Sequence, residues 1–420
     1  MDKFIIHGGK VLNGTVNVSG AKNATLALMP ATLLAEGRYR LSNTPVLRDV
    51  TTMSRMLETM GLQLELKDHV LTIDSSHVTS YEASYEHVKK MRASIYVLGP
   101  LVARYGYAKV SLPGGCAWGP RPVNLHIEGI QKLGAEVVLD SGYIVAKAGR
   151  LRGARITFDV SSVGATGNVM MAAVLAKGTT IIENAAIEPE ITELASFLVK
   201  MGARVYGIGT NRLEIEGVAE LHPADETTIP DRIEAGTFLI AGALAGGKVR
   251  VQNCDPQHLT ALLAKLEATG AQLFVNKGSI ELVASESIRP VDVTTAIHPG
   301  FPTDLQAQWI ALMSIANGSA VVKDTIYFDR FKHVPELNRL GANIELEENL
   351  AVVKGVKSLK GAKVMSTDLR ASASLILAGL VAEGTTEVLR VYHIDRGYEK
   401  IERKLQALGA DIARVAGEEF

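Results

Sequence analysis

The chain has 420 residues, of which 47% are hydrophobic and 21% charged, so it can bury the cores of two or three domains and is not typical of disordered proteins. Its 44 lysine and arginine residues balance 45 aspartate and glutamate residues, which argues against a nucleic-acid-binding protein with a broad basic surface. Two cysteines are too few for a disulfide framework or a cysteine-rich metal site, and no apolar run is long enough for a membrane span. We therefore expect a cytoplasmic, soluble protein that binds neither nucleic acid nor a membrane, and that holds no metal.

Two series of glycines recur along the chain at intervals of 66 to 73 residues. The first series closes apolar segments, and the second precedes short runs that alternate apolar and polar residues. Their members are Gly37, Gly106, Gly178, Gly247, Gly318 and Gly384, and Gly61, Gly134, Gly202, Gly270, Gly341 and Gly409. Two series with one period predict six copies of a unit made of a helix, a strand, a second helix and further strands.

The alternating N-terminal segment, residues 4–19, precedes the first apolar helix, while the sixth copy ends soon after its second helix. We expect the N-terminal segment to supply the strands that the sixth copy lacks. This predicts one domain over residues 21–229, with copies one to three, and another over residues 1–20 plus 230–420, with copies four to six. Two crossings of the chain, near residues 20 and 229, would suit a cleft that opens and closes.

The residues that begin the first helix of each copy are unusual, because four of them are cations. Counting back 14 or 15 residues from each glycine of the first series gives Lys22, Arg92, Gly164, Arg232, Asp304 and Arg370. A helix N-terminus already carries a partial positive charge, so a bound anion is one natural compensation for a cation there. The alternative, for any one of them, is an ion pair with an acidic neighbour.

Residues 87–127 contain six basic residues and no acidic one, which favours a small anion over a nucleic acid in a neutral protein. Within this stretch, residues 113–122 include three glycines and three prolines, so they predict a loop after the strand at 108–112. The loop carries Cys116, whose pKa nearby cations would lower. The alternative, a small apolar filler, suits Cys254 better.

The fourth copy shows the repeated unit clearly. Residues 233–246 are apolar nearly all round, as in a buried helix, and residues 248–252 alternate like a strand. Four leucines then fall on one face of a second helix that ends at Gly270. Residues 272–275 and 279–282 predict a hairpin, and a further strand is expected near 291–294.

Two C-terminal segments carry candidate chemistry. Asp304, at the end of residues 298–304, lies at a helix start and could accept a proton, although an N-cap is the more common role of such an aspartate. Residues 393–399 place Arg396 beside a glycine, where a structural turn is the alternative.

Taken together, these motifs resemble those of the UDP-N-acetylglucosamine 1-carboxyvinyltransferases, a family of enolpyruvyl transferases, over essentially the whole chain. The segments that carry the resemblance are Ser19-Gly-Ala-Lys-Asn23, Met91-Arg-Ala-Ser94, Leu112-Pro-Gly-Gly-Cys116, Ser162-Val-Gly-Ala-Thr166, Pro230-Asp-Arg-Ile233, Phe301-Pro-Thr-Asp304, Thr367-Asp-Leu-Arg-Ala-Ser372 and His393-Ile-Asp-Arg-Gly397. The resemblance implies an α/β fold in which six repeated units form two inverted α/β barrel-like domains with a cleft between them.

The resemblance also implies the reaction and its residues. The substrates would be phosphoenolpyruvate and UDP-N-acetylglucosamine, with no cofactor, and a homo-oligomer is compatible with the sequence. The enolpyruvyl group would pass to the 3′-hydroxyl through a tetrahedral ketal, with Cys116 as general acid and covalent adduct site and Asp304 as base. Lys22, Arg121 and Arg396 would hold the phosphate and the carboxylate. The full set of matching substrate positions is Lys22, Asn23, Arg92, Arg121, Pro122, Val123, Asn124, Leu125, Ser162, Val163, Gly164, Asp304, Ile326, Arg330, Arg370 and Arg396.

Two residues depart from the family pattern, because Val160 stands where some relatives have lysine and Asn124 where many have aspartate. The nearest rival is 5-enolpyruvylshikimate-3-phosphate synthase, which shares the fold and the donor, and the loop with Cys116 disfavours it. A ring-shaped DNA clamp of six α/β repeats is disfavoured by the near-zero net charge, and a non-catalytic sugar-nucleotide-binding paralogue by the presence of all four catalytic candidates.

Overall fold

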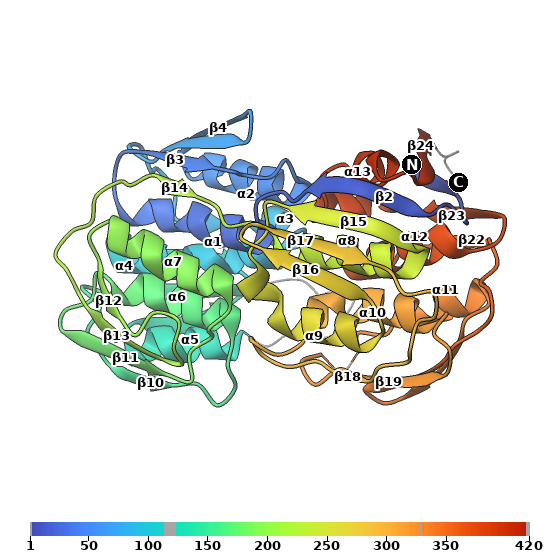
Figure 1. The fold of residues 1–420 in the computed structure, drawn as a ribbon. Coiled ribbons are helices and arrows are strands. Elements are labelled where there is room, and N and C mark those ends of the chain that lie inside the picture. The colour runs from blue at the N-terminus through green and yellow to red at the C-terminus, as the bar shows by residue number, and fades with distance from the viewer. Residues whose placement is uncertain (1, 113–122, 328, 417–420) are drawn as a thin grey trace. The chain divides into compact units, whose positions relative to one another are not determined.

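The computed structural model describes residues 2–112, 123–327 and 329–416, and the chain divides into two compact units (Figure 1). Unit 1 comprises residues 1–19 and 230–420, and unit 2 comprises residues 20–229. Each unit has its own buried apolar cluster among the described residues, so each has a separate hydrophobic core.

The strands of unit 2 form three four-stranded sheets within the described residues, with strand orders β14-β3-β5-β4, β6-β7-β9-β8 and β10-β11-β13-β12. In every sheet the first strand of that order is parallel to the second, and the remaining pairs are antiparallel. The strands are β3 (Arg38–Ser42), β4 (Gln63–Lys67), β5 (Val70–Asp74), β6 (Glu82–Ala83), β7 (Tyr107–Ser111), β8 (Glu136–Asp140), β9 (Tyr143–Lys147), β10 (Arg155–Thr157), β11 (Thr179–Glu183), β12 (Arg204–Tyr206), β13 (Arg212–Glu216) and β14 (Glu226–Thr227).

The described strands of unit 1 likewise form three four-stranded sheets, with orders β16-β17-β15-β2, β18-β19-β21-β20 and β22-β23-β1-β24. They are β1 (Asp2–His7), β2 (Leu12–Asn17), β15 (Gly247–Gln252), β16 (Gln272–Asn276), β17 (Ser279–Val283), β18 (Val293–Thr294), β19 (Ser319–Lys323), β20 (Asn343–Glu347), β21 (Leu350–Lys354), β22 (Lys363–Met365), β23 (Thr385–Leu389) and β24 (Asp411–Ala416). The hairpin predicted in the fourth copy is confirmed as β16 and β17, which pair antiparallel around Lys277 and Gly278.

The two N-terminal strands join different sheets. β1 lies between β23 and β24 and completes the sheet of the sixth copy, as the sequence predicts. β2 instead pairs with β15 as the parallel edge strand of the fourth copy. The N-terminal segment is therefore shared between two repeats rather than given to one.

Three buried helices form the centre of each unit, inside the sheets (Figure 1). In unit 2 they are α1 (Lys22–Ala31), α4 (Leu98–Tyr105), which continues the 3₁₀ helix η2 (Arg92–Val97), and α6 (Val163–Ala173). In unit 1 they are α8 (Arg232–Ala245), α10 (Gln306–Met313), which continues η4 (Thr303–Leu305), and α12 (Leu369–Val381). Ile233 to Leu244 of α8 are all buried, as expected for a helix that is apolar all round.

The outer helices pack with an apolar face against neighbouring central helices or strands of the same unit. They are α2 (Arg48–Thr59), α5 (Asn124–Lys132), α7 (Pro189–Lys200), α9 (Thr260–Ala268), α11 (Val334–Arg339) and α13 (Ile401–Ala407), and the remaining short elements are η1 (Thr32–Leu34), α3 (Tyr85–Val88), η3 (Pro256–Leu259) and η5 (Val391–Arg396). No helix in the described part of the chain has the length and apolar character needed to cross a membrane.

The glycine series are explained by backbone conformation. All members of both series have a φ between 69° and 144°, a region that favours glycine. Each glycine of the second series directly follows the C-cap residue of an outer helix, which is the usual place for a left-handed glycine. At Gly61 a Cβ would in addition lie 2.2 Å from the carbonyl oxygen of His77. The spacing of the second glycine series in the sequence is therefore the spacing between the C-termini of successive outer helices.

Candidate active site

The residues predicted to begin the central helices all lie within the first two positions of those helices. Lys22, Arg92 and Arg232 are the first residues of α1, η2 and α8, and Gly164, Asp304 and Arg370 are the second residues of α6, η4 and α12. This confirms the positions inferred from the glycine spacing. The exposed N-terminal N–H groups of a helix, together with these side chains, place most of the candidate chemistry at helix starts.

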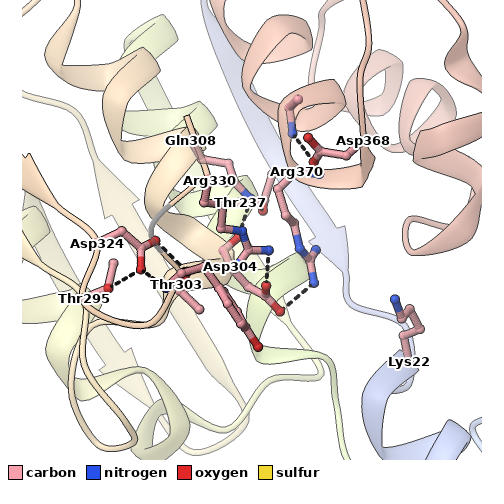
Figure 2. Close-up of polar contacts among 12 residues, drawn as sticks. Lys22, Thr237, Thr295, Thr303, Asp304, Gln308, Asp324, Arg330, Asp368 and Arg370 are labelled. Atoms are coloured by element: carbon pink, nitrogen blue, oxygen red, sulfur yellow. Dashed lines mark hydrogen bonds and ion pairs between the residues drawn. The ribbon is translucent and has the colours of Figure 1, made fainter. Parts of the chain in front are cut away.

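Asp304 is held between two arginines of unit 1 (Figure 2). Its Oδ1 accepts a hydrogen bond from Nη2 of Arg330 at 2.5 Å, and its Oδ2 accepts one from Nη2 of Arg370 at 3.0 Å. The arginine side chains are 6% and 7% exposed, whereas that of Asp304 is 24% exposed. The alternative role as an N-cap is wrong, because no side chain caps η4 or α10. The carboxylate is instead an accessible anion whose orientation two buried cations fix.

Arg370 is held by a hydrogen-bond network that includes polar groups of two other central helices, α8 and α10, and of the chain after η5. Its Nη1 donates to the hydroxyl of Tyr398 at 3.2 Å, and that hydroxyl also contacts Thr237 Oγ1 at 2.8 Å and Gln308 Nε2 at 3.1 Å. Burial, the largest single influence, would lower the pKa of Arg370, but Asp304, Tyr398 and Asp231 together outweigh it and raise that pKa above its ordinary value. Arg370 is therefore a permanent cation in this cluster.

The N-terminus of α12, where Arg370 lies, has a carboxylate cap. Oδ1 of Asp368 accepts hydrogen bonds from the backbone N–H groups of Arg370 at 2.8 Å and Ala371 at 3.0 Å. This cap satisfies two donors and offsets the positive end of the helix. It belongs to the segment Thr367–Ser372 that the sequence singled out, but its role there was not predicted.

Lys22 is compensated within unit 2 by a carboxylate. Its Nζ lies 3.2 Å from Oδ2 of Asp49, and the two side chains are only 13% and 4% exposed. The N-cap residue of α1, Ala21, offers no side-chain hydrogen bond, and Asp49 at the start of α2 supplies a negative charge to Lys22. The alternative of an acidic partner is thus right for both Lys22 and Arg370.

Three of the basic residues in the stretch at 87–127 form ion pairs. Lys89, Lys109 and Arg104 form ion pairs with Glu86, Glu82 and Glu36 at 2.7, 3.2 and 3.9 Å, respectively. Those acidic residues precede the stretch in the sequence, and the helices and strands bring them back against it. Of the basic residues in this stretch, Arg92 remains a described candidate at a helix start.

His126, in the first turn of α5, is buried against the start of α6. Its Nδ1 lies 3.0 Å from Nδ2 of Asn168, whose Oδ1 accepts from the N–H of Gly99 at 2.6 Å. Because this fixes the Asn168 amide as a donor to Nδ1, the imidazole proton is assigned to Nε2. A Cβ on Gly164 would lie 3.1 Å from that Nε2, so a larger residue there would require the imidazole to shift by a few tenths of an ångström. Burial, and then the charge of Arg92, lower the pKa of His126 to about 3.

The other predicted substrate positions fall on loops and helix starts. Ser162 is the N-cap of α6, its Oγ accepting from the N–H of Ala165 at 3.2 Å, and Val163 opens that helix. Asn23 is the second residue of α1, Val123 is the N-cap residue of α5, and Asn124 and Leu125 begin α5. Ile326 follows β19, and Arg396 ends η5. Cys116, Arg121 and Pro122 lie outside the described residues, as do the loop positions around them.

The structure therefore brings Asp304, Arg330 and Arg370 into direct contact, and it brings Gly164 and Arg92 into the surroundings of His126. Sequence reasoning missed the supporting residues, which are Asp49, His126, Asn168, Thr237, Gln308, Asp368 and Tyr398. Only Asp368 carried a signal, as an aspartate just before a helix. No group of three or more potential metal ligands is found in the described ranges.

Comparison with known proteins gives one consistent match. Residues 6–405 match the EPSP synthase (3-phosphoshikimate 1-carboxyvinyltransferase) family. The UDP-N-acetylglucosamine 1-carboxyvinyltransferase of Chloroherpeton thalassium is 58% identical over 423 residues, covering 100% of this chain and 99% of the relative. That of Geotalea daltonii is 53% identical over 415 residues, covering 99% and 100%.

Solved structures agree on the fold. The enolpyruvyl transferase NikO from Streptomyces tendae superimposes with a TM-score of 0.90 at 26% identity, covering 99% of both chains. An EPSP synthase from Acinetobacter baumannii gives a TM-score of 0.76 at 18% identity, covering 99% of this chain and 100% of the other, which shows the fold alone.

The buried, neutral His126 predicts a pH-dependent stability. Its pKa falls from an ordinary value of 6.5 to about 3 on folding, so the unfolded chain takes up the proton first as the pH is lowered. The associated stability is full above about pH 6.5 and is lost progressively as the pH falls towards 3. Between pH 6.5 and pH 5, the variant His126→Gln should lose about 1.5 kcal/mol less free energy of unfolding than the parent. Urea titrations of both proteins at the two pH values measure this, and equal losses would contradict the assignment.

Proposed function

We infer that this chain, which belongs to the EPSP synthase family of enolpyruvyl transferases and within it to the UDP-N-acetylglucosamine 1-carboxyvinyltransferases, transfers the enolpyruvyl group of phosphoenolpyruvate to the 3′-hydroxyl of UDP-N-acetylglucosamine and releases phosphate. The observation that carries this inference is the identity of 53–58% over essentially the whole chain. The alternative acceptor, 3-phosphoshikimate, has weaker support, because the EPSP synthase structure shares only 18% of its residues. The reaction opens peptidoglycan synthesis. We further propose that it takes place in the cytoplasm, because both substrates are anionic metabolites that a bilayer excludes.

The proposed reaction is an addition followed by an elimination. The 3′-hydroxyl oxygen adds to C2 of phosphoenolpyruvate while its proton passes to a base and the methylene carbon gains a proton from an acid. The tetrahedral ketal then loses phosphate and one methyl proton, which restores the double bond. The step needs a base on one side, an acid on the other and cations around the phosphate and the carboxylate.

Asp304 is the proposed base. Its carboxylate is the accessible member of the cluster with Arg330 and Arg370, and both oxygens have fixed positions. An ionised carboxylate that retains exposed surface can accept a proton from a hydroxyl group brought against it. Cys116, which lies outside the described residues, is the proposed acid at the methylene carbon.

Lys22, Arg121 and Arg396 are proposed to hold the phosphate and the carboxylate of phosphoenolpyruvate, with Arg92 contributing at the start of η2. Lys22 is the first residue of α1, whose first N–H groups lack intrahelical partners, and the ion pair with Asp49 orients its ammonium group. The nucleotide sugar is proposed to be bound by Asn23, residues 121–125, residues 162–164 and Ile326. In that set the N-terminus of α6 offers backbone N–H groups to a diphosphate.

The proposed function is tested by phosphate release. The purified chain with phosphoenolpyruvate and UDP-N-acetylglucosamine should release one phosphate for each enolpyruvyl product, and 3-phosphoshikimate should not replace the sugar nucleotide. Mass spectrometry of the products identifies the enolpyruvyl ether. Turnover with 3-phosphoshikimate alone would assign the sister reaction instead, and binding without turnover would indicate a non-catalytic paralogue.

Asp304→Asn should lose kcat by about 100-fold or more while KM for either substrate changes little, because the amide cannot take the hydroxyl proton. The amide of the variant has one acceptor oxygen, so it can accept a hydrogen bond from Arg330 or Arg370 but not from both. Because this could lower stability, thermal unfolding of the variant should be measured in parallel. If kcat of Asp304→Asn is close to that of the parent, Asp304 is not the base.

Lys22→Ala should raise KM for phosphoenolpyruvate and also lower kcat. Lys22→Arg, which keeps the ion pair with Asp49, should recover part of both losses.

Fosfomycin, the epoxide antibiotic to which the family resemblance points, should form one adduct on this chain, on Cys116. The second cysteine is an internal control, because Cys254 is only 4% exposed and burial raises the pKa of its thiol to about 11. Cys116→Asp should retain turnover and resist the drug, because a carboxyl group can also deliver a proton to carbon, and Cys116→Ala should lose most turnover. Peptide mapping by mass spectrometry measures the adduct, and labelling of Cys254 in place of Cys116 would overturn the assignment.

A further inference from the structure

Asp324 is a completely buried carboxylate that the proposed reaction does not use. It is 0% exposed and follows β19 directly. Its Oδ1 accepts hydrogen bonds from the hydroxyl of Thr295 and from the backbone N–H groups of Ile326 and Tyr327, each at 2.9 Å. Its Oδ2 accepts one from the hydroxyl of Thr303 at 2.7 Å. Four neutral donors therefore satisfy both of its oxygens.

Sheet register brings these groups together. β18 and β19 are parallel, and Thr294 lies opposite Lys323, so Thr295 and Asp324 are the next residues at the same edge of the sheet. Thr303 opens η4, directly before Asp304. The carboxylate of Asp324 is thus placed by the end of β19 against the turn that carries the proposed base (Figure 2).

The hydroxyl of Thr303 has one proton, and its direction can be assigned. Because the carboxylate of Asp324 accepts it, the oxygen of Thr303 must be the acceptor for Nη1 of Arg330, at 2.8 Å. Nη2 of the same guanidinium donates to Asp304 Oδ1 at 2.5 Å. The planar guanidinium therefore spans two consecutive residues, Thr303 and Asp304, and its orientation depends on both.

Burying a carboxylate costs free energy of desolvation unless hydrogen-bond donors satisfy its oxygens. A neutral residue at this position would avoid that cost. Asp324 adds two constraints that a neutral residue would not. It forces the hydroxyl of Thr303 to present its lone pair to Arg330, and it fixes the turn at Ile326, the residue proposed to contact the sugar nucleotide.

We propose that Asp324 and Thr303 are positioning residues for Asp304, acting through Arg330, and that they couple the base to the acceptor-binding turn at Ile326. This inference rests on the proposed function, since it assumes that Asp304 accepts the hydroxyl proton. The effect of Asp324 and Thr303 passes through the guanidinium group that both of them orient.

Thr303→Val tests the proposal because it keeps the shape of the side chain and removes the hydroxyl. We expect kcat to fall about tenfold, the effect of losing one hydrogen bond to a charged group, with KM for phosphoenolpyruvate unchanged. Thr303→Ser, which keeps the hydroxyl, should recover kcat to within about twofold of the parent. Thr269→Val is the matched control, because Thr269 is a buried threonine of the same unit whose hydroxyl donates to the carbonyl of Leu266, at the end of α9. It should lose stability without losing kcat.

A double variant separates positioning from general damage. If Thr303 acts through Asp304, then Thr303→Val combined with Asp304→Asn should be no slower than Asp304→Asn alone, whereas independent effects would multiply to a further tenfold loss. Asp324→Asn should resemble Thr303→Val in kcat and in addition raise KM for UDP-N-acetylglucosamine, because its amide group can turn a donor towards Thr303 and loosen the turn at Ile326.

The outcomes distinguish this proposal from the proposed function. A parent enzyme without turnover overturns the function. An active parent with a Thr303→Val variant of equal kcat, or with multiplicative losses in the double variant, overturns the positioning role alone. Equal losses of kcat in Thr303→Val, Thr303→Ser and Thr269→Val would also overturn it, because they would reflect damage to the fold.

Discussion

One carboxylate shared by two buried guanidinium groups is the constraint on which the chemistry of unit 1 depends. Arg330 and Arg370 are each about 6% exposed, and a buried cation without a counter-charge is strongly disfavoured. Asp304 therefore stabilises both arginines as much as they orient it. The cluster joins the first turn of the central helix pair η4 and α10 to the N-terminus of α12, and the chain after η5 enters through Tyr398. A base held in this way keeps its geometry whether or not a hydroxyl group is bound, which is the preorganisation that proton transfer needs.

The repeated architecture was largely predictable because each repeat needs glycines at the same left-handed backbone positions. Left-handed glycines end helices at fixed intervals, and central helices are apolar all round, so period and burial can both be found in a single sequence. The same period locates the starts of the central helices, and with them Lys22, Asp304 and Arg370. The one topological detail that pattern could not supply is the sharing of the N-terminal strands, because β1 and β2 alternate equally well whichever sheet they join.

The supporting residues of the site could not be predicted in the same way. Asp49 meets Lys22 across 27 positions of sequence, and Asp324 meets Thr303 across 21, in segments without any local signature of such a contact. Each contact is made by tertiary packing: one by the approach of α2 to α1, the other by the residue after β19 lying against the first residue of η4. A sequence motif identifies residues that contact substrate more readily than residues that orient their neighbours, because a contact made by tertiary packing leaves no local pattern in the sequence.

The way in which the two arginines use their donors distinguishes their roles from that of Lys22. Arg330 directs one terminal nitrogen to Thr303 and the other to Asp304, and Arg370 directs its two to Tyr398 and Asp304. A guanidinium group whose two terminal nitrogens already bind protein acceptors has little geometric freedom to grip a phosphate bidentately. Lys22, by contrast, is a point charge with three rotatable donors, and its ion pair with Asp49 at 3.2 Å is long for a charge-assisted hydrogen bond. This favours Arg330 and Arg370 as the groups that fix the base, and it favours Lys22 among the described residues as a ligand of the transferred phosphate.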